Sequence, residues 1–273
     1  MARLGDTSVE AQRVWVETFR RMPPERKWLI LEDAFQTARI LHSAGFRKRY
    51  PRSTAVDIQR DWLQSQFGYV GEFPDGPPMS LNVQAMQVLA EVIRALDREG
   101  IPYALGGSLA SSYYGISRFT QDADLTVEPF LGKEHQLAAC FGPEYYKSVP
   151  AMEQANRHFS SFNIIHTLAG FKVDFFVRKD TPFEQSAMAR RQAVYLPGGL
   201  SQPVMIHSKE DVVLFKLRWY RLGQETSDQQ WSDVLNMLKT KADTLDDAYL
   251  DQWAADLGVT DLLIRARQEA LIP

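Results

Sequence analysis

The chain has 273 residues, of which 45% are hydrophobic and 11% aromatic, so it can form a folded core and is not wholly disordered. The net charge of −3 is uneven, because residues 1–70 carry +4 and the remainder carries −7. A single cysteine, Cys140, excludes an internal disulfide and a cysteine-based zinc cluster. No apolar run reaches the length of a membrane span, which predicts a cytoplasmic protein with no membrane partner.

Residues 1–67 are predicted to form a helical N-terminal region that acts as a regulatory or partner-like unit. Apolar residues at helical spacing predict a first helix over about 9–19. A second helix is expected over 25–44 with Gly45 as its stop, and a third over about 54–67.

The segment F-R-K-R-Y-P-R at 46–52 carries four basic residues around two aromatic residues. Basic residues interleaved with aromatic rings can bind phosphates and stack on bases. Lys and Arg are also favoured at helix C-termini by the helix macrodipole. The sequence alone favours this structural explanation over nucleic-acid binding.

Residues 68–80 are dense in Gly and Pro and predict a linker. Residues 81–207 then mix helix and strand patterns, and residues 208–273 are again helical. The chain is therefore predicted to have an α+β fold, in which helices flank a mixed sheet between helical N-terminal and C-terminal regions. The strands are expected at 103–105, 123–127, 160–166 and 171–177, and the later helices near 80–98, 133–141, 208–219, 227–238, 246–257 and 260–270.

A turn of Gly106, Gly107 and Ser108 precedes two aspartates, Asp122 and Asp124, in a strand-like segment. Strand side chains alternate between faces, so both carboxylates should project from one face, with Cα atoms roughly 6–7 Å apart. Two aligned carboxylates facing a glycine turn suit a Mg²⁺ ion that holds a polyphosphate. The glycines allow backbone N–H groups to approach phosphates, and Ser108 adds a hydroxyl at a helix start.

Asp174 lies inside an apolar strand pattern, where an unpaired buried charge is costly, so it should face a cation or a cleft. Lys172 and Phe176 share its face. Together with Asp122 and Asp124, Asp174 predicts a metal site for two Mg²⁺ ions, with Mn²⁺ as an alternative. One ion would grip the nucleotide phosphates and the second would activate an acceptor hydroxyl, whose proton Asp174 is placed to accept.

The ordered set of G-G-S, thirteen residues, D-A-D-L and a third Asp in K-V-D-F-F resembles the nucleotidyltransferase superfamily. It is most similar to small bacterial AbiEii-type and toxin–antitoxin-associated members, over about residues 81–258. The resemblance implies an enzyme that transfers an NMP from an NTP to a hydroxyl on tRNA or protein, with a cognate toxin or antitoxin as a partner. It also implies a catalytic core that consists of Gly106, Gly107, Ser108, Asp122, Asp124 and Asp174. Two further residues, Arg118 and Lys216, are implied to contact phosphates.

Two alternative functions remain open at this stage. One is an antibiotic-modifying enzyme with the same core, and the other is a catalytically idle nucleotide-binding module of a toxin–antitoxin complex. Lys216 also has alternatives, since it can extend to solvent from an apolar helix face or pair with Asp233. The acceptor, the preferred NTP and the oligomeric state are not encoded in any motif.

Overall fold

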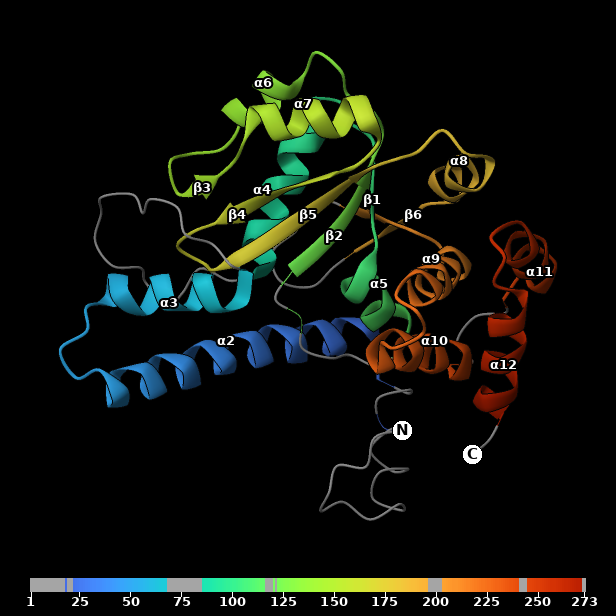
Figure 1. The fold of residues 1–273 in the computed structure, drawn as a ribbon, viewed down its shortest axis with the longest axis horizontal. Helices are drawn as coiled ribbons and strands as arrows, with labels where there is room; N and C mark the ends of the chain where they lie inside the picture. Colours follow the sequence, from blue (N-terminus) through green and yellow to red (C-terminus); the bar gives the residue numbers. More distant parts are fainter. Residues whose placement is uncertain are drawn as a thin grey trace.

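The computed structural model describes residues 18, 22–67, 85–115, 120, 122–195, 203–240 and 245–271. These residues form a seven-stranded sheet in the order β3-β4-β5-β2-β1-β7-β6, with helices around it (Figure 1). The fold is therefore α+β with a mixed sheet flanked by helices, as the sequence predicts.

The sheet combines parallel and antiparallel pairs. β2 pairs in parallel with β5, and β1 with β7, whereas the other neighbours are antiparallel. The hairpin expected from the two strand patterns around 170 is confirmed as β4 and β5. The strands are β1 Tyr103–Leu105, β2 Asp122–Val127, β3 Tyr145–Tyr146, β4 Ser161–His166, β5 Phe171–Val177, β6 Gln192–Val194 and β7 Val204–Ile206.

The predicted C-terminal helices are confirmed, and serine side chains begin two of them. Ser208 accepts a hydrogen bond from the Asp211 N–H, and Ser227 accepts one from the Gln230 N–H. No helix within the described ranges is both long and apolar enough to cross a membrane. The helices are α2 Pro24–Arg49, α3 Ala55–Phe67, α4 Ala85–Arg98, α5 Gly107–Tyr114, α6 Glu134–Ala139, α7 Val149–His158, α8 Pro182–Ala189, α9 Lys209–Leu222, α10 Asp228–Lys239, α11 Asp247–Asp256 and α12 Thr260–Leu271.

The predicted helix stop at Gly45 is wrong, because α2 continues to Arg49. The Phe46 ring lies 6.2 Å from His42 and 4.8 Å from Tyr50, so aromatic contacts at i±4 carry the helix past the glycine. Such contacts offset the roughly 1 kcal/mol that an interior glycine costs relative to alanine. The predicted first helix (apart from residue 18), the linker and the start of the helix before Arg98 lie outside the described residues.

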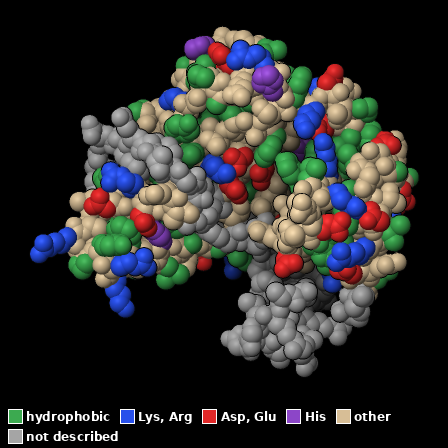
Figure 2. Space-filling view, in the orientation of Figure 1, with side chains coloured by type: hydrophobic (Ala, Val, Ile, Leu, Met, Phe, Trp, Pro, Cys, Tyr) green, Lys and Arg blue, Asp and Glu red, His purple; other side chains and the backbone are tan. Residues whose placement is uncertain are grey.

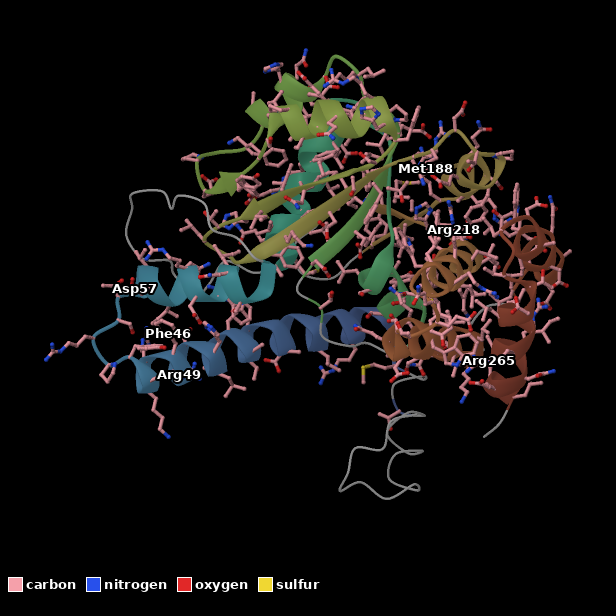
Figure 3. The ribbon with its side chains drawn as sticks, in the orientation of Figure 1. Phe46, Arg49, Asp57, Met188, Arg218 and Arg265 are labelled. Atoms are coloured by element: carbon pink, nitrogen blue, oxygen red, sulfur yellow. The ribbon has the colours of Figure 1, made fainter. Side chains whose placement is uncertain are left out.

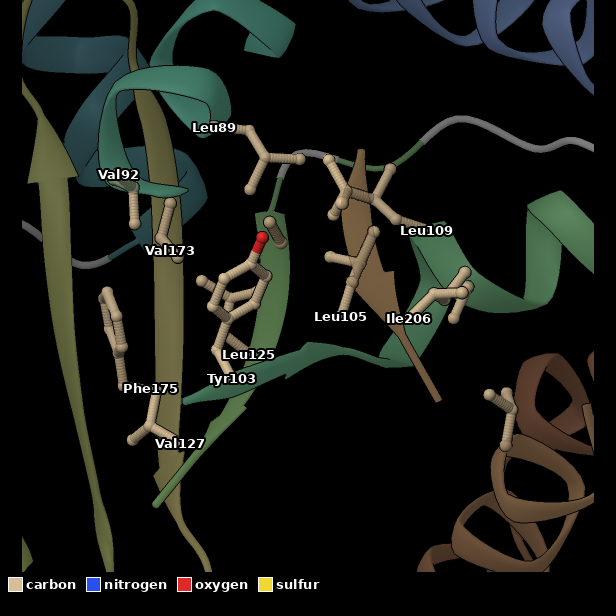
Figure 4. Packing of buried hydrophobic residues seen from close by; sticks show 14 of the residues in the cluster. Leu89, Val92, Tyr103, Leu105, Leu109, Leu125, Val127, Val173, Phe175 and Ile206 are labelled. Atoms are coloured by element: carbon tan, nitrogen blue, oxygen red, sulfur yellow. The ribbon is translucent and has the colours of Figure 1, made fainter. Parts of the chain in front are cut away.

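The main core occupies one face of the central strands. Leu89 and Val92 of α4 face Leu125, Val173 and Phe175 of the sheet (Figure 4), and all five side chains are buried. Burying each such side chain contributes about 1.5–3 kcal/mol relative to leaving it exposed. Because strand residues alternate, the residues between them point to the opposite face, which is the face that carries the aspartates.

The N-terminal helices α2 and α3 are fastened to the turn that leads into β5. The Trp62 indole N–H donates to the Gly170 carbonyl at 3.3 Å, and the buried Arg39 guanidinium donates to the Ala169 carbonyl at 2.5 Å. Trp62 is itself part of the main core. The division of the chain at 68–80 and at 207 stays a prediction.

Candidate active site

The pairing of β2 with β5 brings the three predicted aspartates together. Asp124 lies directly opposite Asp174, and Asp122 lies opposite Lys172. Neighbouring strands are about 4.8 Å apart, and in-register residues of parallel strands share a face, so these four side chains form one polar group. They are half-buried, whereas the residues between them are buried in the core. Acidic side chains gather beside basic ones near the centre of the face in Figure 2.

The glycine turn holds Asp124 in place. The Gly106 N–H donates to the Asp124 carbonyl at 2.8 Å, and the Ser108 N–H donates to the Asp124 carboxylate. Gly107 has a φ of +54°, and a Cβ there would lie 2.7 Å from the Asp124 Cβ and would overlap the carboxylate. The position therefore requires glycine. The Gly106 N–H, which was expected to approach phosphates, bonds the Asp124 backbone instead, and the Ser108 N–H holds the Asp124 carboxylate at the N-terminus of α5.

The site concentrates negative charge. Burial and, to a lesser extent, the charges of Asp122 and Asp174 together raise the pKa of Asp124 to about 6, while Lys216 opposes them. Burial also raises the pKa of Asp174, against the ammonium of Lys172, which lies 2.5 Å from its carboxylate. A group of carboxylates that repel one another in this way will attract a cation.

The donor set fits a divalent ion of the Mg²⁺ type. Mg²⁺ is usually held by one or two carboxylates and completes its coordination with substrate phosphates and water, so Asp122 and Asp124 would hold the first ion. Across the residues that the structure describes, no three His, Cys, Asp or Glu side chains form a ready-made metal cluster. Asp174 faces Lys172 instead. The predicted second ion would need Lys172 to move aside, and it stays a prediction.

Lys216 is buried and lies between two residues of α10. Its Nζ is 2.9 Å from the Asp233 carboxylate and donates to the Gln230 side-chain oxygen at 2.9 Å. The alternative pairing with Asp233 is therefore observed, and Lys216 acts on Asp124 through its charge. Arg118, the other predicted phosphate contact, lies outside the described residues.

A pocket of about 590 Å³ extends from the glycine turn and Asp124 toward α9. Its far wall is aromatic, since the rings of Phe176 and Trp219 lie 6.2 Å apart at 59° and Phe215 lines the same pocket. Trp219 is 53% exposed, which is unusual for so large an apolar ring. The volume lies within the range of small-molecule sites.

Polar groups lie beside this aromatic wall. The Arg218 guanidinium donates to the Glu184 carboxylate at 3.0 Å, and that carboxylate also accepts from the Lys179 N–H at 2.7 Å. Figure 3 shows Arg218 on α9, on the opposite side of the view from Arg49 at the end of α2. The pocket thus offers hydrogen-bonding groups beside ring faces, as recognition of a flat heterocycle requires.

Sequence reasoning missed the aromatic wall. Phe215 and Trp219 are four residues apart and share a helix face, and the sequence marked both only as apolar residues of the predicted helix over 208–219. The available signal was Phe176, which alternation places on the Asp174 face and therefore outside the core.

No protein family and no curated protein sequence matches the chain. Among solved structures, the chain is similar to the antibiotic-resistance factor ANT(2'')-Ia, at 14% identity and a TM-score of 0.38 over 68% of this chain and 95% of that one. It is also similar to an antigenic nucleotidyltransferase-like protein from Paracoccidioides brasiliensis, at 18% identity and a TM-score of 0.44 over 70% and 95%. At these identities and TM-scores neither similarity assigns a function to this chain, and neither bears on the narrower AbiEii-type resemblance.

Proposed function

We propose that this protein is a nucleotidyltransferase that moves an NMP from an NTP to a hydroxyl acceptor and releases pyrophosphate. The observation that carries the proposal is the in-register pairing of Asp124 with Asp174, with Asp122 on the same face. These carboxylates lie beside a pocket that begins at the glycine turn and ends in aromatic rings. The carboxylates and the glycine turn suit the triphosphate of an NTP, and the aromatic pocket suits its base.

The pocket suggests how an NTP would bind. Its triphosphate would lie near Gly107 and the Asp122–Asp124 pair, and its base would lie against Phe176 and Trp219. Stacking of a base on aromatic rings contributes about 1–3 kcal/mol. Mg²⁺ bound to the two carboxylates would neutralise phosphate charge in the ground state and in the transition state.

The chain's own residues account for the transfer step. The acceptor oxygen attacks the α-phosphorus, and the bond from that phosphorus to the pyrophosphate oxygen breaks. The Asp174 carboxylate receives the proton of the acceptor hydroxyl, a role that suits a half-buried carboxylate with a raised pKa. Lys172 orients this carboxylate through their ion pair.

We also propose the acceptor, the biological role and the partner of the protein. The resemblance of the motifs to AbiEii-type proteins supports a tRNA or protein acceptor, a toxin–antitoxin or defence role and a cognate toxin or antitoxin partner. Mn²⁺ is an alternative to Mg²⁺ at the same carboxylates.

The test is to incubate the purified protein with each labelled NTP and Mg²⁺, with and without total tRNA or cell lysate. Asp174→Asn removes the proton acceptor, and Asp256→Asn is a matched control because Asp256 is exposed on α11. We expect the wild type and the control to label macromolecules, and Asp174→Asn to lose about 100-fold or more of the rate. Absence of transfer with every NTP, or equal transfer by Asp174→Asn, would reject the proposal.

A further inference from the structure

A compact basic patch lies at the end of α2 and in the loop after it. It consists of Arg47, Lys48, Arg49, Tyr50 and Arg52, all of which are exposed. Figure 3 shows Arg49 at this end of α2, on the opposite side of the view from Arg218, which lines the proposed nucleotide pocket. The patch therefore lies apart from the proposed nucleotide pocket.

The positive charge of the patch is not neutralised within the described part of the chain. None of its four basic side chains forms an ion pair with a described carboxylate, and nearby Asp57 is engaged by Thr54 and Arg60. On the C-terminal helices, by contrast, Arg265 and Arg267 pair with carboxylates at 2.5–2.8 Å. Exposed charge left unpaired in this way is available to an anionic partner.

Tyr50 gives the patch an aromatic surface. It is 51% exposed, and its ring packs on Phe46, which stacks on His42. His42 in turn meets the buried Trp62 edge-on, with ring centroids 5.0 Å apart. These ring contacts hold Tyr50 in place while about half of the residue remains exposed, which leaves room for a base to stack on it.

The patch is also fixed relative to the proposed transfer site. Trp62 and Arg39 bond to carbonyls of the turn before β5, and β5 carries Asp174. Figure 1 shows α2 and α3 running along the end of the sheet where β5 begins. A chain bound to the patch is thus held on the same body as the aspartates.

We propose that the basic patch binds single-stranded RNA, with phosphates on the four cationic side chains and a base on Tyr50. A helix macrodipole explains basic residues in the last turn of α2, but not Arg52 beyond it or the open ring of Tyr50. A single strand fits best, because its unstacked bases are free to stack on an exposed ring. If the proposed function holds, this RNA is the acceptor.

The binding test uses a fluorescent single-stranded RNA of about 12 nucleotides, measured by anisotropy without NTP and in EDTA, from about 50 to 200 mM salt. The variant is Arg47→Gln with Arg49→Gln. Its control is Arg26→Gln with Arg265→Gln, which removes the same charge from exposed sites outside the patch. We expect the patch variant to bind about tenfold or more weakly, with the slope of log K against log salt falling from about −2.8 to about −1.4.

Tyr50→Ala should also weaken RNA binding about tenfold, because it removes one stacked base. An equal loss of RNA affinity in the patch variant and in its control would overturn the proposal. Binding of the protein to vesicles with about 30% anionic lipid, without binding to RNA, would also overturn it. RNA binding through the patch without nucleotidyl transfer would reject the proposed function alone. If the patch variant transfers nucleotides to RNA at the wild-type rate, the proposed RNA-binding role of the patch alone would be rejected.

Discussion

Replacement of Asp124 by Asn should stabilise the metal-free protein while abolishing the proposed nucleotidyl transfer. The Asp124 carboxylate is crowded by Asp122 and Asp174, and burial raises its pKa to about 6 from an ordinary value of 3.8. That gap corresponds to about 3 kcal/mol of destabilisation by the ionised form at pH 7.5. An Asn oxygen can still accept the Ser108 N–H, so we expect a net gain of about 1–3 kcal/mol.

The pH dependence gives the sign of this effect. Between pH 3.8 and about 6, the folded state binds more protons at Asp124 than the unfolded state does. The stability of the wild type therefore falls as the pH rises through this window, and the Asn variant lacks that loss. The advantage of the variant should be complete above about pH 6 and should shrink below about 1 kcal/mol near pH 4.

Thermal unfolding in EDTA at several pH values measures this difference, with Asp256→Asn as the control for loss of an exposed carboxylate. We expect Asp124→Asn to raise the midpoint at pH 7.5 by about 2–4 °C per kcal/mol. Added Mg²⁺ should then raise the midpoint of the wild type alone. A variant that is less stable than the wild type at pH 7.5, or equally stabilised at pH 4, would refute this reasoning.

Three further substitutions test the turn, the pocket and the N-terminal helices. Gly107→Ala should cost about 100-fold in transfer, because its Cβ would displace the Asp124 carboxylate. Gly258→Ala, also at positive φ (+67°) but with open space around its Cβ, should cost only about 1–2 kcal/mol of stability, and equal activities of the two variants would contradict this. Trp219→Ala should weaken binding of a non-hydrolysable NTP about tenfold by calorimetry, and an effect no larger than that of exposed Ile264→Ala would exclude the ring from the site. Gly170→Ala should loosen α2 and α3, because its Cβ would overlap the α3 indole, and unchanged hydrogen exchange over 22–67 would count against that docking.

The face of the sheet that carries the aspartates was predictable because strand alternation is local. Asp174 interrupts an apolar strand pattern, so its side chain is expected to point away from the core. Lys172 and Phe176, two residues away on either side, then point to the same face. The register that sets Asp124 opposite Asp174 was not predictable, since it depends on pairing between strands about 50 residues apart in the chain.

Tertiary contacts explain the other differences from expectation. Gly107 resembles a phosphate-binding glycine in sequence, yet its conformation is required by the side chain of Asp124, which only the folded chain brings close. Trp219 fits a core stripe because helical periodicity does not distinguish a core from an aromatic pocket wall. Gly45 fails to end α2 because rings on either side of it stack along the helix.

The central claim is that Asp174 receives the acceptor proton while the rest of the site binds the nucleotide. The most direct measurement compares the wild type with Asp174→Asn for both NTP affinity and single-turnover transfer in the presence of Mg²⁺. We expect affinity to stay within a few-fold, because Asp174 is paired with Lys172 and the pocket is intact, and transfer to fall about 100-fold or more. Transfer at the wild-type rate by Asp174→Asn would contradict the account.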